Sequence, residues 1–329
     1  MKYLIVGSNS FSGASFVRHL LDRGNEVIGI SRSAEPHEAY LPYRWSSCDA
    51  ARFQFQQLDL NRDLAQICAL VSDTRPECVV NFAAQGMVGE SWLSPEDWYQ
   101  TNVVAQVALH DQLRRMPFIK RYLHISTPEV YGHTEGWTSE HFQFAPSSPY
   151  AVSRAACDLH LLSFFKAYDF PAIFTRAANV YGAGQQLYRI IPRALMAALT
   201  GKKLDLHGGG HSQRCFIHID DVCTGTEQIA LNGVPGEAYH LSTTEPISIR
   251  ELVERVARTF DLSLDEVAQQ SEERLGKDDS YLLDSSKMQR ELGWASQTTL
   301  DSGIDGVKQW AEARLPFLIT EPLAYQHRK

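Results

Sequence analysis

The sequence contains no hydrophobic run of about 18 residues, the length that a membrane-spanning helix needs. It also lacks the basic, apolar and small-residue order of an export signal, because Met1 leads directly into a short strand pattern and a glycine turn. The six cysteines include no Cys-x-x-Cys pair, and several fall inside apolar periodic runs where a reduced thiol packs. We therefore expect a soluble protein of the reducing cytoplasm, without a membrane partner.

Runs of like charge, internal repeats and low-complexity tracts are also absent. Lys and Arg number 31 against 39 Asp and Glu, which gives a net charge of −8 and no basic stripe for a phosphate backbone. The 12 histidines are spread over different expected elements without the spacing of metal ligands. These absences argue against a nucleic-acid partner and a metal site. What is left is an ordinary globular chain of 329 residues, long enough for two domains.

The chain opens with the pattern of a strand, a glycine turn, a helix and a second strand. Residues 3–6 form the first strand pattern, GSNSFSG follows, and helical apolar spacing precedes the strand pattern at 26–30. Such a turn lets backbone N–H groups and the helix N-terminus approach a pyrophosphate closely. A serine stands where the middle glycine is usual, but the place of the motif after the first strand favours a dinucleotide site. The cofactor contacts expected in this turn are Gly7, Ser10, Phe11 and Gly13.

The end of the second strand bears on which dinucleotide binds. A carboxylate at this place would bond the ribose 2′-hydroxyl of NAD, but the chain has Ser31, Arg32 and Ser33. A guanidinium accommodates a 2′-phosphate, so Arg32 predicts NADP as the cofactor, with NAD as the alternative. In the other interpretation, Arg32 is a solvated loop cation.

Strand and helix patterns continue to alternate up to about residue 175. We expect a third strand from residue 53 that ends at 58–60, a helix capped by Asn61, a fourth strand at 79–82 and a long helix from Trp98 to Met116. The alternation predicts an α/β fold, a Rossmann-type doubly wound parallel sheet with right-handed crossovers. Two strand ends should supply further cofactor contacts: Asp59 (near the adenine amino group) with Leu60, and Ala83 with Ala84.

One stretch combines a hydroxyl, a carboxylate, a phenol and a guanidinium. Thr127 and Glu129 follow a strand pattern at 121–125, and Tyr150 and Arg154 begin a helical segment after a loop. Tyr150 and Arg154 lie one helical turn apart and share a face, where the guanidinium would lower the pKa of the phenol. Tyr150 is thus a candidate general base, and Glu129 a second acid or base if its loop folds back over the helix start. A surface pair is the other interpretation of Tyr-x-x-x-Arg.

The helical segment 150–168 carries more apolar residues along one stripe than packing on one face of a sheet needs. The stripe consists of Leu159, Leu162, Phe165 and Tyr168. Together with the helix at 98–116, it predicts a homodimer interface. Ordinary core packing explains the stripe equally well.

After a strand pattern at 173–176, arginines, an asparagine and several glycines collect in a looser segment. Guanidinium and amide groups suit phosphate oxygens, so this cluster predicts a site for a diphosphate and a base: Arg176, Asn179, Arg189, Arg193 and Arg214. Asp220 or Asp221 is expected to cap the next helix. We expect a cofactor domain at 1–176 plus about 216–242 and a smaller α/β C-terminal substrate lobe at 177–215 plus 243–329.

Together these motifs resemble the extended short-chain dehydrogenase/reductase family and, within it, the nucleotide-sugar 4,6-dehydratases. The resemblance runs nearly from end to end, over the glycine turn, NFAAQ from Asn81, STPEVYG from Ser126, SPYAVSR from Ser148, the RxxNxYG run from Arg176, RCFIHIDD from Arg214 and RLGKDDSYLLDSSKMQRELGW from Arg274. AAQGMVGESW is similar to GDP-mannose 4,6-dehydratases, whereas LYRIIP and GGGHSQR are more similar to dTDP-glucose 4,6-dehydratases. The identity of the substrate therefore stays open.

The resemblance implies roles for individual residues. Thr127 would orient the sugar 4-hydroxyl, Glu129 would take the C5 proton, and Tyr150 would remove the hydroxyl proton as hydride leaves C4. The dinucleotide, with Tyr150 and Arg154 among its contacts, would be tightly bound and recycled within the reaction. The expected contacts of the nucleotide-diphosphate sugar substrate are Gln85, Asn179, Arg189, His207, Arg214 and Arg274.

Two residues depart from the family pattern. Arg154 stands where the family has lysine; it can still bond ribose and lower the tyrosine pKa, but it cannot donate a proton. Pro128 stands where the dTDP-glucose enzymes have an aspartic acid that protonates the departing C6 hydroxyl, so Glu129 must serve as both base and acid. The expected function is a nucleotide-sugar 4,6-dehydratase. The alternatives are a nucleotide-sugar 4-epimerase or uronic-acid decarboxylase of the same fold, and a dinucleotide-sensing regulator with a weakened active site.

Overall fold

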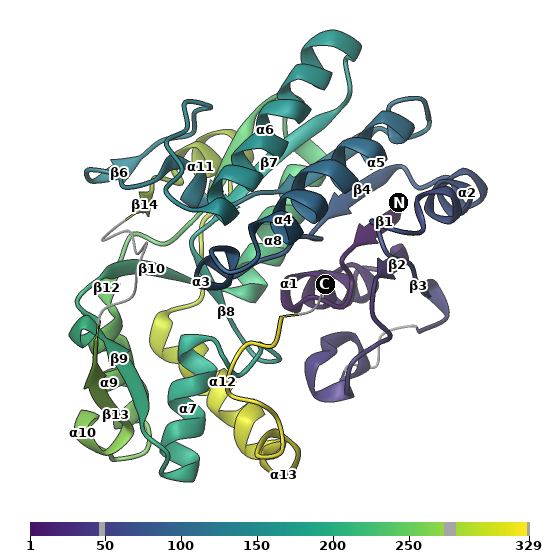
Figure 1. Ribbon diagram of the computed structural model, residues 1–329. Helices are drawn as coiled ribbons and strands as arrows, with labels where there is room; N and C mark the ends of the chain where they lie inside the picture. The colour runs from purple at the N-terminus through teal and green to yellow at the C-terminus, as the bar shows by residue number, and fades with distance from the viewer. Residues whose placement is uncertain (46–49, 273–280, 328–329) are drawn as a thin grey trace.

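A seven-stranded parallel sheet forms the centre of the molecule in the computed structural model, which describes residues 1–45, 50–272 and 281–327 (Figure 1). The strand order is β11-β7-β5-β4-β1-β2-β3. The order reverses between β1 and β4, which confirms the predicted Rossmann-type doubly wound sheet; ligands bind beyond the carboxyl ends of the strands at such a reversal. The strands are β1 (Lys2–Val6), β2 (Glu26–Ser31), β3 (Phe53–Gln57), β4 (Cys78–Asn81), β5 (Arg121–Ile125), β7 (Ala172–Ala177) and β11 (Ala238–Leu241).

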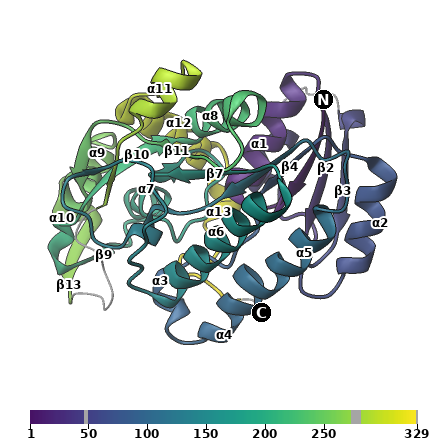
Figure 2. The same cartoon turned by 90° about the horizontal axis from the view of Figure 1, so that it is seen from above.

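Helices cover both faces of this sheet, as the view from above shows (Figure 2). Tyr3 and Ile5 of β1 belong to the core under α1 and α8, whereas Leu4 and Val6 belong to the core under α2, α5 and α6. Strands buried on both faces carry continuous apolar runs, and this is why β1 shows no polar alternation. The helices are α1 (Phe11–Asp22) and α8 (Ile219–Asn232) on one face, and α2 (Leu64–Thr74), α4 (Pro95–Tyr99), α5 (Ala105–Leu113) and α6 (Pro149–Tyr168) on the other.

The predicted single helix from Trp98 to Met116 is wrong in one respect, because a π-helical turn, η4 (Gln100–Val104), separates α4 from α5. The wider turn carries Asn102, which is fully buried. Asn102 Nδ2 donates to Gln85 O at 3.0 Å, and Gln85 N donates to Asn102 Oδ1 at 2.8 Å. The π-helical turn therefore fixes the backbone that leaves β4, at the edge where ligands bind.

Two predicted helix caps are also wrong. Asp63, not Asn61, precedes α2, and Asn61 Nδ2 instead donates to Thr101 Oγ1 at 3.2 Å. His218 caps α8 by accepting from Asp220 N, because the helix begins one residue before the acidic pair. Asp221 accepts from the backbone N–H groups of residues 297 and 298 and so ties α8 to the approach to α12.

A smaller lobe beside the carboxyl ends of the large sheet has a core of its own, drawn from residues 181–216, 247–268 and 304–318. Its strands are β8 (Asn179–Tyr181), β10 (Gln213–His218) and β12 (Pro246–Ser248) in one sheet, and β9 (Leu204–His207) with β13 (Ala268–Ser271) in another. Its helices are α7 (Ile190–Thr200), α9 (Ile249–Arg258), α10 (Leu264–Val267), α12 (Leu300–Ala313) and α13 (Leu315–Leu318).

Short elements complete the chain: α3 (Val88–Ser91), α11 (Ser286–Leu292), the β6 (Trp137–Thr138) and β14 (Leu282–Leu283) pair, and the 3-10 turns η1 (Glu38–Tyr40), η2 (Pro42–Arg44), η3 (Ala50–Arg52), η5 (Pro128–Tyr131) and η6 (Gly208–Gly210). None of the helices in the described ranges is long and apolar enough to cross a membrane. The same ranges contain no group of three or more His, Cys, Asp or Glu side chains suited to a metal ion.

Candidate active site

A cavity of about 1520 Å³ lies where the large sheet meets the smaller lobe. Pockets for one drug-sized ligand measure about 300–1,000 Å³, so this cavity is larger than a single such ligand needs. Most of the predicted site residues line it: Ser10, Phe11, Arg32, Ala84, Gln85, Thr127, Glu129, Tyr150, Arg154, Asn179, Arg189, His207 and Arg214. Gly7, Gly13, Asp59, Leu60 and Ala83 are not among the lining residues, and Arg274 lies outside the described residues.

The two glycines of the turn act by allowing close packing. Gly7 has φ +85°, and a Cβ there would lie 2.8 Å from Ala83 N; a Cβ on Gly13 would collide with Gly7 O. Ser10 explains the missing middle glycine, because its Oγ donates to Gly7 O at 2.7 Å and accepts from Gly13 N at 3.0 Å. The serine thus closes the turn and caps α1 at the cavity wall.

Arg32 lies at the end of β2 and lines the cavity. The flanking serines are bonded to the glycine turn: Asn9 N donates to Ser31 Oγ at 3.0 Å, and Asn9 Nδ2 donates to Ser33 O at 2.9 Å. The segment that carries Arg32 is therefore held against the start of α1. By contrast, Leu60 is buried in the apolar core of the large sheet, and Asp59 Oδ1 accepts from Asn61 N at 2.9 Å.

Thr127, Glu129 and Tyr150 come together as predicted from their strand-end and helix-start positions. Ser148 caps α6, with Pro149 as its first residue, which places Tyr150 in the first turn. The Thr127 side chain is hydrogen-bonded to the Tyr150 hydroxyl. Thr127 also caps η5, the short turn that carries Glu129.

The prediction of a lowered Tyr150 pKa is wrong for this arrangement. Burial raises the pKa of Tyr150, and the Glu129 carboxylate raises it further. Arg154, the bond from Thr127, and Arg189 act in the opposite direction but do not outweigh these effects. The phenol is therefore neutral near pH 7 unless a further positive charge arrives beside it.

Arg154 is held by the strand that precedes the site. Its side chain is 1% exposed, and its Nη2 donates to Ile125 O and to His124 Nε2, the latter at 3.2 Å. Burial and the nearby Arg154 charge hold the pKa of His124 well below its usual range, so His124 is a neutral acceptor. Arg154 Nε and Nη1 are buried and have no hydrogen-bond partner among the described residues. Two donors thus remain for a ligand that enters the cavity.

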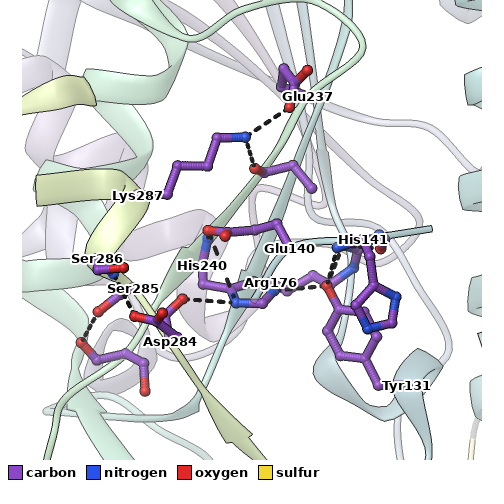
Figure 3. Close-up of polar contacts among 12 residues, drawn as sticks. Tyr131, Glu140, His141, Arg176, Glu237, His240, Asp284, Ser285, Ser286 and Lys287 are labelled. Carbon is purple, nitrogen blue, oxygen red and sulfur yellow. Dashed lines mark hydrogen bonds and ion pairs between the residues drawn. The ribbon is translucent and has the colours of Figure 1, made fainter. Parts of the chain in front are cut away.

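Arg176 does not belong to the diphosphate cluster that was predicted to include it. It is fully buried and does not line the cavity. Its Nη2 donates to Asp158 Oδ2 at 2.8 Å. Its Nη1 donates to Tyr131 Oη at 2.7 Å (Figure 3). Tyr131 Oη is also hydrogen-bonded to His240 Nε2 at 2.8 Å, and His240 N donates to Glu140 Oε1 at 2.9 Å. This buried network ties β7 and β11 to the loop that follows Glu129.

The smaller lobe supplies the opposite wall. Asn179, Arg189 and Arg214 line the cavity there. Tyr281, which sequence reasoning did not single out, donates to Asn179 Oδ1 at 3.0 Å, and the Arg214 guanidinium lies 4.4 Å from its ring centre. Tyr281 follows GKDDS in the segment from Arg274 that resembles the family, and that position was the available signal. Tyr188 and Tyr325 also line the cavity and were not predicted.

Residues 4–307 match the protein family described as GDP-mannose 4,6 dehydratase. The chain belongs to this family. It is 29% identical over 332 residues to a dTDP-glucose 4,6-dehydratase of Neisseria gonorrhoeae, with 93% of this chain and 94% of the relative covered. A dTDP-glucose 4,6-dehydratase of Streptomyces antibioticus is 31% identical over 314 residues, with coverage of 94% and 92%. The family resemblance predicted from the motifs is thus confirmed.

Solved structures show the same fold. The dTDP-glucose 4,6-dehydratase DesIV of Streptomyces venezuelae, solved with NAD bound, has a TM-score of 0.90 and 28% identity, and the match covers 98% of this chain and 100% of that one. A UDP-glucuronic acid 4-epimerase of Bacillus cereus, solved with UDP-glucuronic acid and NAD, has a TM-score of 0.83 and 25% identity, with coverage of 95% and 99%. Dehydratases and epimerases therefore share this architecture, and the residues of the site must distinguish them.

Proposed function

We propose that the protein is a nucleotide-sugar 4,6-dehydratase, which converts a nucleotide-diphosphate sugar into its 4-keto-6-deoxy form. The observation that carries the proposal is the position of a carboxylate, Glu129, on the same cavity wall as the Thr127–Tyr150 pair. A 4-epimerase needs the threonine and the tyrosine but has no use for a base at C5. The dehydratases among the family's relatives support the same conclusion.

The site fits a nicotinamide dinucleotide as cofactor. The Gly7 turn makes a cradle that a Cβ would fill, and the buried donors Nε and Nη1 of Arg154 suit ribose hydroxyls. Ser10 and Phe11 at the start of α1 would flank the pyrophosphate, and Arg32 favours a 2′-phosphate and hence NADP, although solved relatives carry NAD. When bound, the oxidised cofactor would accept the hydride that leaves C4 of the sugar and would bring a positive charge to the site.

The residues of the chain then divide the proton transfers. Thr127 orients the 4-hydroxyl, and Tyr150 accepts its proton as hydride leaves C4, since the added cation opposes the effect of burial on the tyrosine pKa. The resulting ketone acidifies C5, Glu129 takes that proton, and the same proton leaves with the C6 hydroxyl as water. Hydride returns to C6, and C5 gains a proton from solvent that offsets the 4-hydroxyl proton held by Tyr150, so protons and electrons balance. Pro128 has no proton to give, which leaves Glu129 as both base and acid.

The substrate diphosphate would lie against the smaller lobe. Asn179, Arg189 and Arg214 face the cavity there, and cationic forks and amide donors suit phosphate oxygens. Gln85 and His207 line the same cavity and would contact the sugar and the nucleotide.

We also propose a homodimer formed by α4, η4, α5 and α6. Large apolar side chains stand exposed on these helices: Tyr99, Val104, Val152, Leu159 and Tyr168. Apolar side chains that cluster on adjacent helices mark an interaction surface more often than scattered ones do.

Incubation of the purified protein with a panel of nucleotide sugars tests the proposed activity. A dehydratase converts one of them into a product lighter by one water, which mass spectrometry detects. An isomer of unchanged mass would instead support the epimerase, and loss of carbon dioxide would support a decarboxylase.

A further inference from the structure

The C-terminal segment 319–327 leaves α13 in the smaller lobe and crosses to α4 of the large sheet. Figures 1 and 2 show it as the yellow trace that runs from α13 toward α4. It forms no helix or strand, so its course depends on side-chain contacts at its two ends and its middle.

The segment is held near both of its ends. Just before it, the Phe317 ring of α13 stacks on His37 at 3.6 Å, and within it Glu321 Oε2 accepts from Tyr40 Oη at 3.4 Å. At its end, His327 Nε2 lies 2.9 Å from Asp97 Oδ2, and the His327 ring stacks on the fully buried Trp98 at 4.9 Å.

The far anchor reaches the ligand edge of the sheet. Trp98 Nε1 donates to Gly86 O at 2.9 Å, and Gly86 belongs to the segment after β4 that lines the cavity. His327 is therefore linked through Trp98 to the backbone that borders the expected dinucleotide site.

Between these anchors, Tyr325 lines the cavity. Its ring meets Tyr188 edge to face at 5.3 Å. Burial raises the pKa of Tyr325, and the charged groups that also affect it belong to three elements: Arg32 after β2, Glu90 in α3, and Arg189 before α7. Tyr325 thus lines the same cavity as Arg189 of the smaller lobe and Arg32, the residue expected to contact the adenosine ribose.

We propose that residues 320–327 form a strap over the dinucleotide half of the cavity, with Tyr325 in contact with the bound cofactor and His327 as the latch. This inference rests on the proposed function, because the chemical class of the ligand is a nicotinamide dinucleotide. An enzyme that returns hydride to its own substrate gains nothing from cofactor exchange, and a strap bonded at both ends slows that exchange. The latch must open before the dinucleotide leaves.

The release rate of the dinucleotide tests the strap. The protein of residues 1–329 is loaded with labelled NADP, or with NAD if that binds more tightly, and release is followed after a chase with excess unlabelled cofactor. His327→Ala removes the bond to Asp97 and the stacking on Trp98, so release should be faster by about tenfold, the factor that corresponds to loss of one hydrogen bond to a charged group. Tyr325→Ala should also speed release.

Controls separate the latch from general destabilisation. His133→Ala changes an exposed histidine in the loop between η5 and β6 and should leave the release rate unchanged. Asp97→Asn should speed release as His327→Ala does, and the double variant should not exceed the larger single effect, because the two residues form one contact. Thermal unfolding of each variant checks that the fold is intact.

Equal release rates for wild type, His327→Ala and Tyr325→Ala would overturn the strap. A protein that binds neither dinucleotide would overturn both the strap and the cofactor assignment. Release is measured without sugar substrate, so an inactive protein with latch-dependent release would refute the dehydratase reaction alone, and an active one with latch-independent release would refute the strap alone.

Discussion

Ser10 and Arg154 show how single side chains compensate for departures from a family pattern. Ser10 bonds both remaining glycines of the turn and so preserves the tight approach that a middle glycine would allow. Arg154 is longer than the usual lysine, and its Nη2 donates to His124 Nε2 and Ile125 O, which fixes the guanidinium against β5. Each departure therefore retains a helix cap or a cation at the wall of the cavity.

Glu129→Gln separates a dehydratase from an epimerase. Glutamine keeps size and hydrogen bonding but discards basicity, and loss of a general base costs about 10²–10⁴ in rate. The variant should oxidise C4, accumulate reduced cofactor visible by its absorbance, and fail to exchange the C5 hydrogen with deuterated water. Glu135→Gln, the same change at an exposed position, is the matched control. If Glu129→Gln turned over substrate at the wild-type rate, the proposed dehydratase function would be wrong and the epimerase function would be favoured.

Arg32→Asp tests the choice of dinucleotide. We expect wild-type protein to bind NADP more tightly than NAD, and the variant to lose NADP affinity while NAD binding is spared, because a carboxylate repels a 2′-phosphate and accepts from a 2′-hydroxyl. Titration with each cofactor measures this. Arg290→Asp, on the outer surface of α11, controls for the change in net charge. A wild-type preference for NAD, or an equal loss of both cofactors, would contradict the assignment.

The elements that position the site differ in how readily a sequence predicts them. Periodic apolar runs and the glycine turn predicted the doubly wound parallel sheet, because buried strands and crossover helices leave strong patterns. The π-helical turn at Asn102 was not predictable, since it depends on a bond to Gln85 in a distant loop. The Tyr150 pKa was predicted in the wrong direction because burial cannot be read from helical spacing. Tyr281 and Tyr325 were not predicted as site residues, because both reach the cavity from positions far along the chain.

The network around β7 and β11 predicts how stability depends on pH. Burial and the Arg176 charge lower the pKa of His240 to about 3 from its ordinary value of 6.5. Its Nδ1 donates to Asp284 O at 3.1 Å, so its Nε2 accepts from Tyr131 and has no room for a second proton. As pH falls below 6.5, the unfolded chain binds a proton that the folded protein refuses, and the free energy of unfolding falls.

His240→Gln isolates this contribution. Below about pH 6.5, the free energy of unfolding of the wild type should fall by up to about 1.4 kcal/mol per pH unit more than that of the variant. Glu140, whose pKa burial raises, contributes in the opposite direction in both proteins and cancels in the comparison. Urea unfolding between about pH 5 and about pH 7.5 measures the two slopes. Parallel slopes would show that His240 takes up its proton in the folded state.

The cavity lies between two apolar cores, one on the large sheet and one in the smaller lobe. The proposed dimer surface lies on the exposed side of α6. We expect the protein to be a dimer in solution and Leu159→Glu to make it a monomer, because the side chain is 49% exposed on α6 and a charge there opposes burial. Leu231→Glu, 41% exposed on α8 across the sheet, should leave the dimer intact. Sedimentation analysis distinguishes these outcomes, and a monomeric wild type would remove the proposed interface.

The sheet order has a consequence for how the chain is made. β11 and α8 complete the large sheet, yet they are synthesised after the first strands of the smaller lobe. A nascent chain that ends near residue 177 has β7 as an open edge and leaves the apolar side of α1 without its partner α8. The large sheet therefore cannot finish folding on the ribosome before the smaller lobe has begun to emerge, and the unfinished intermediate is the state in which chaperones would be needed.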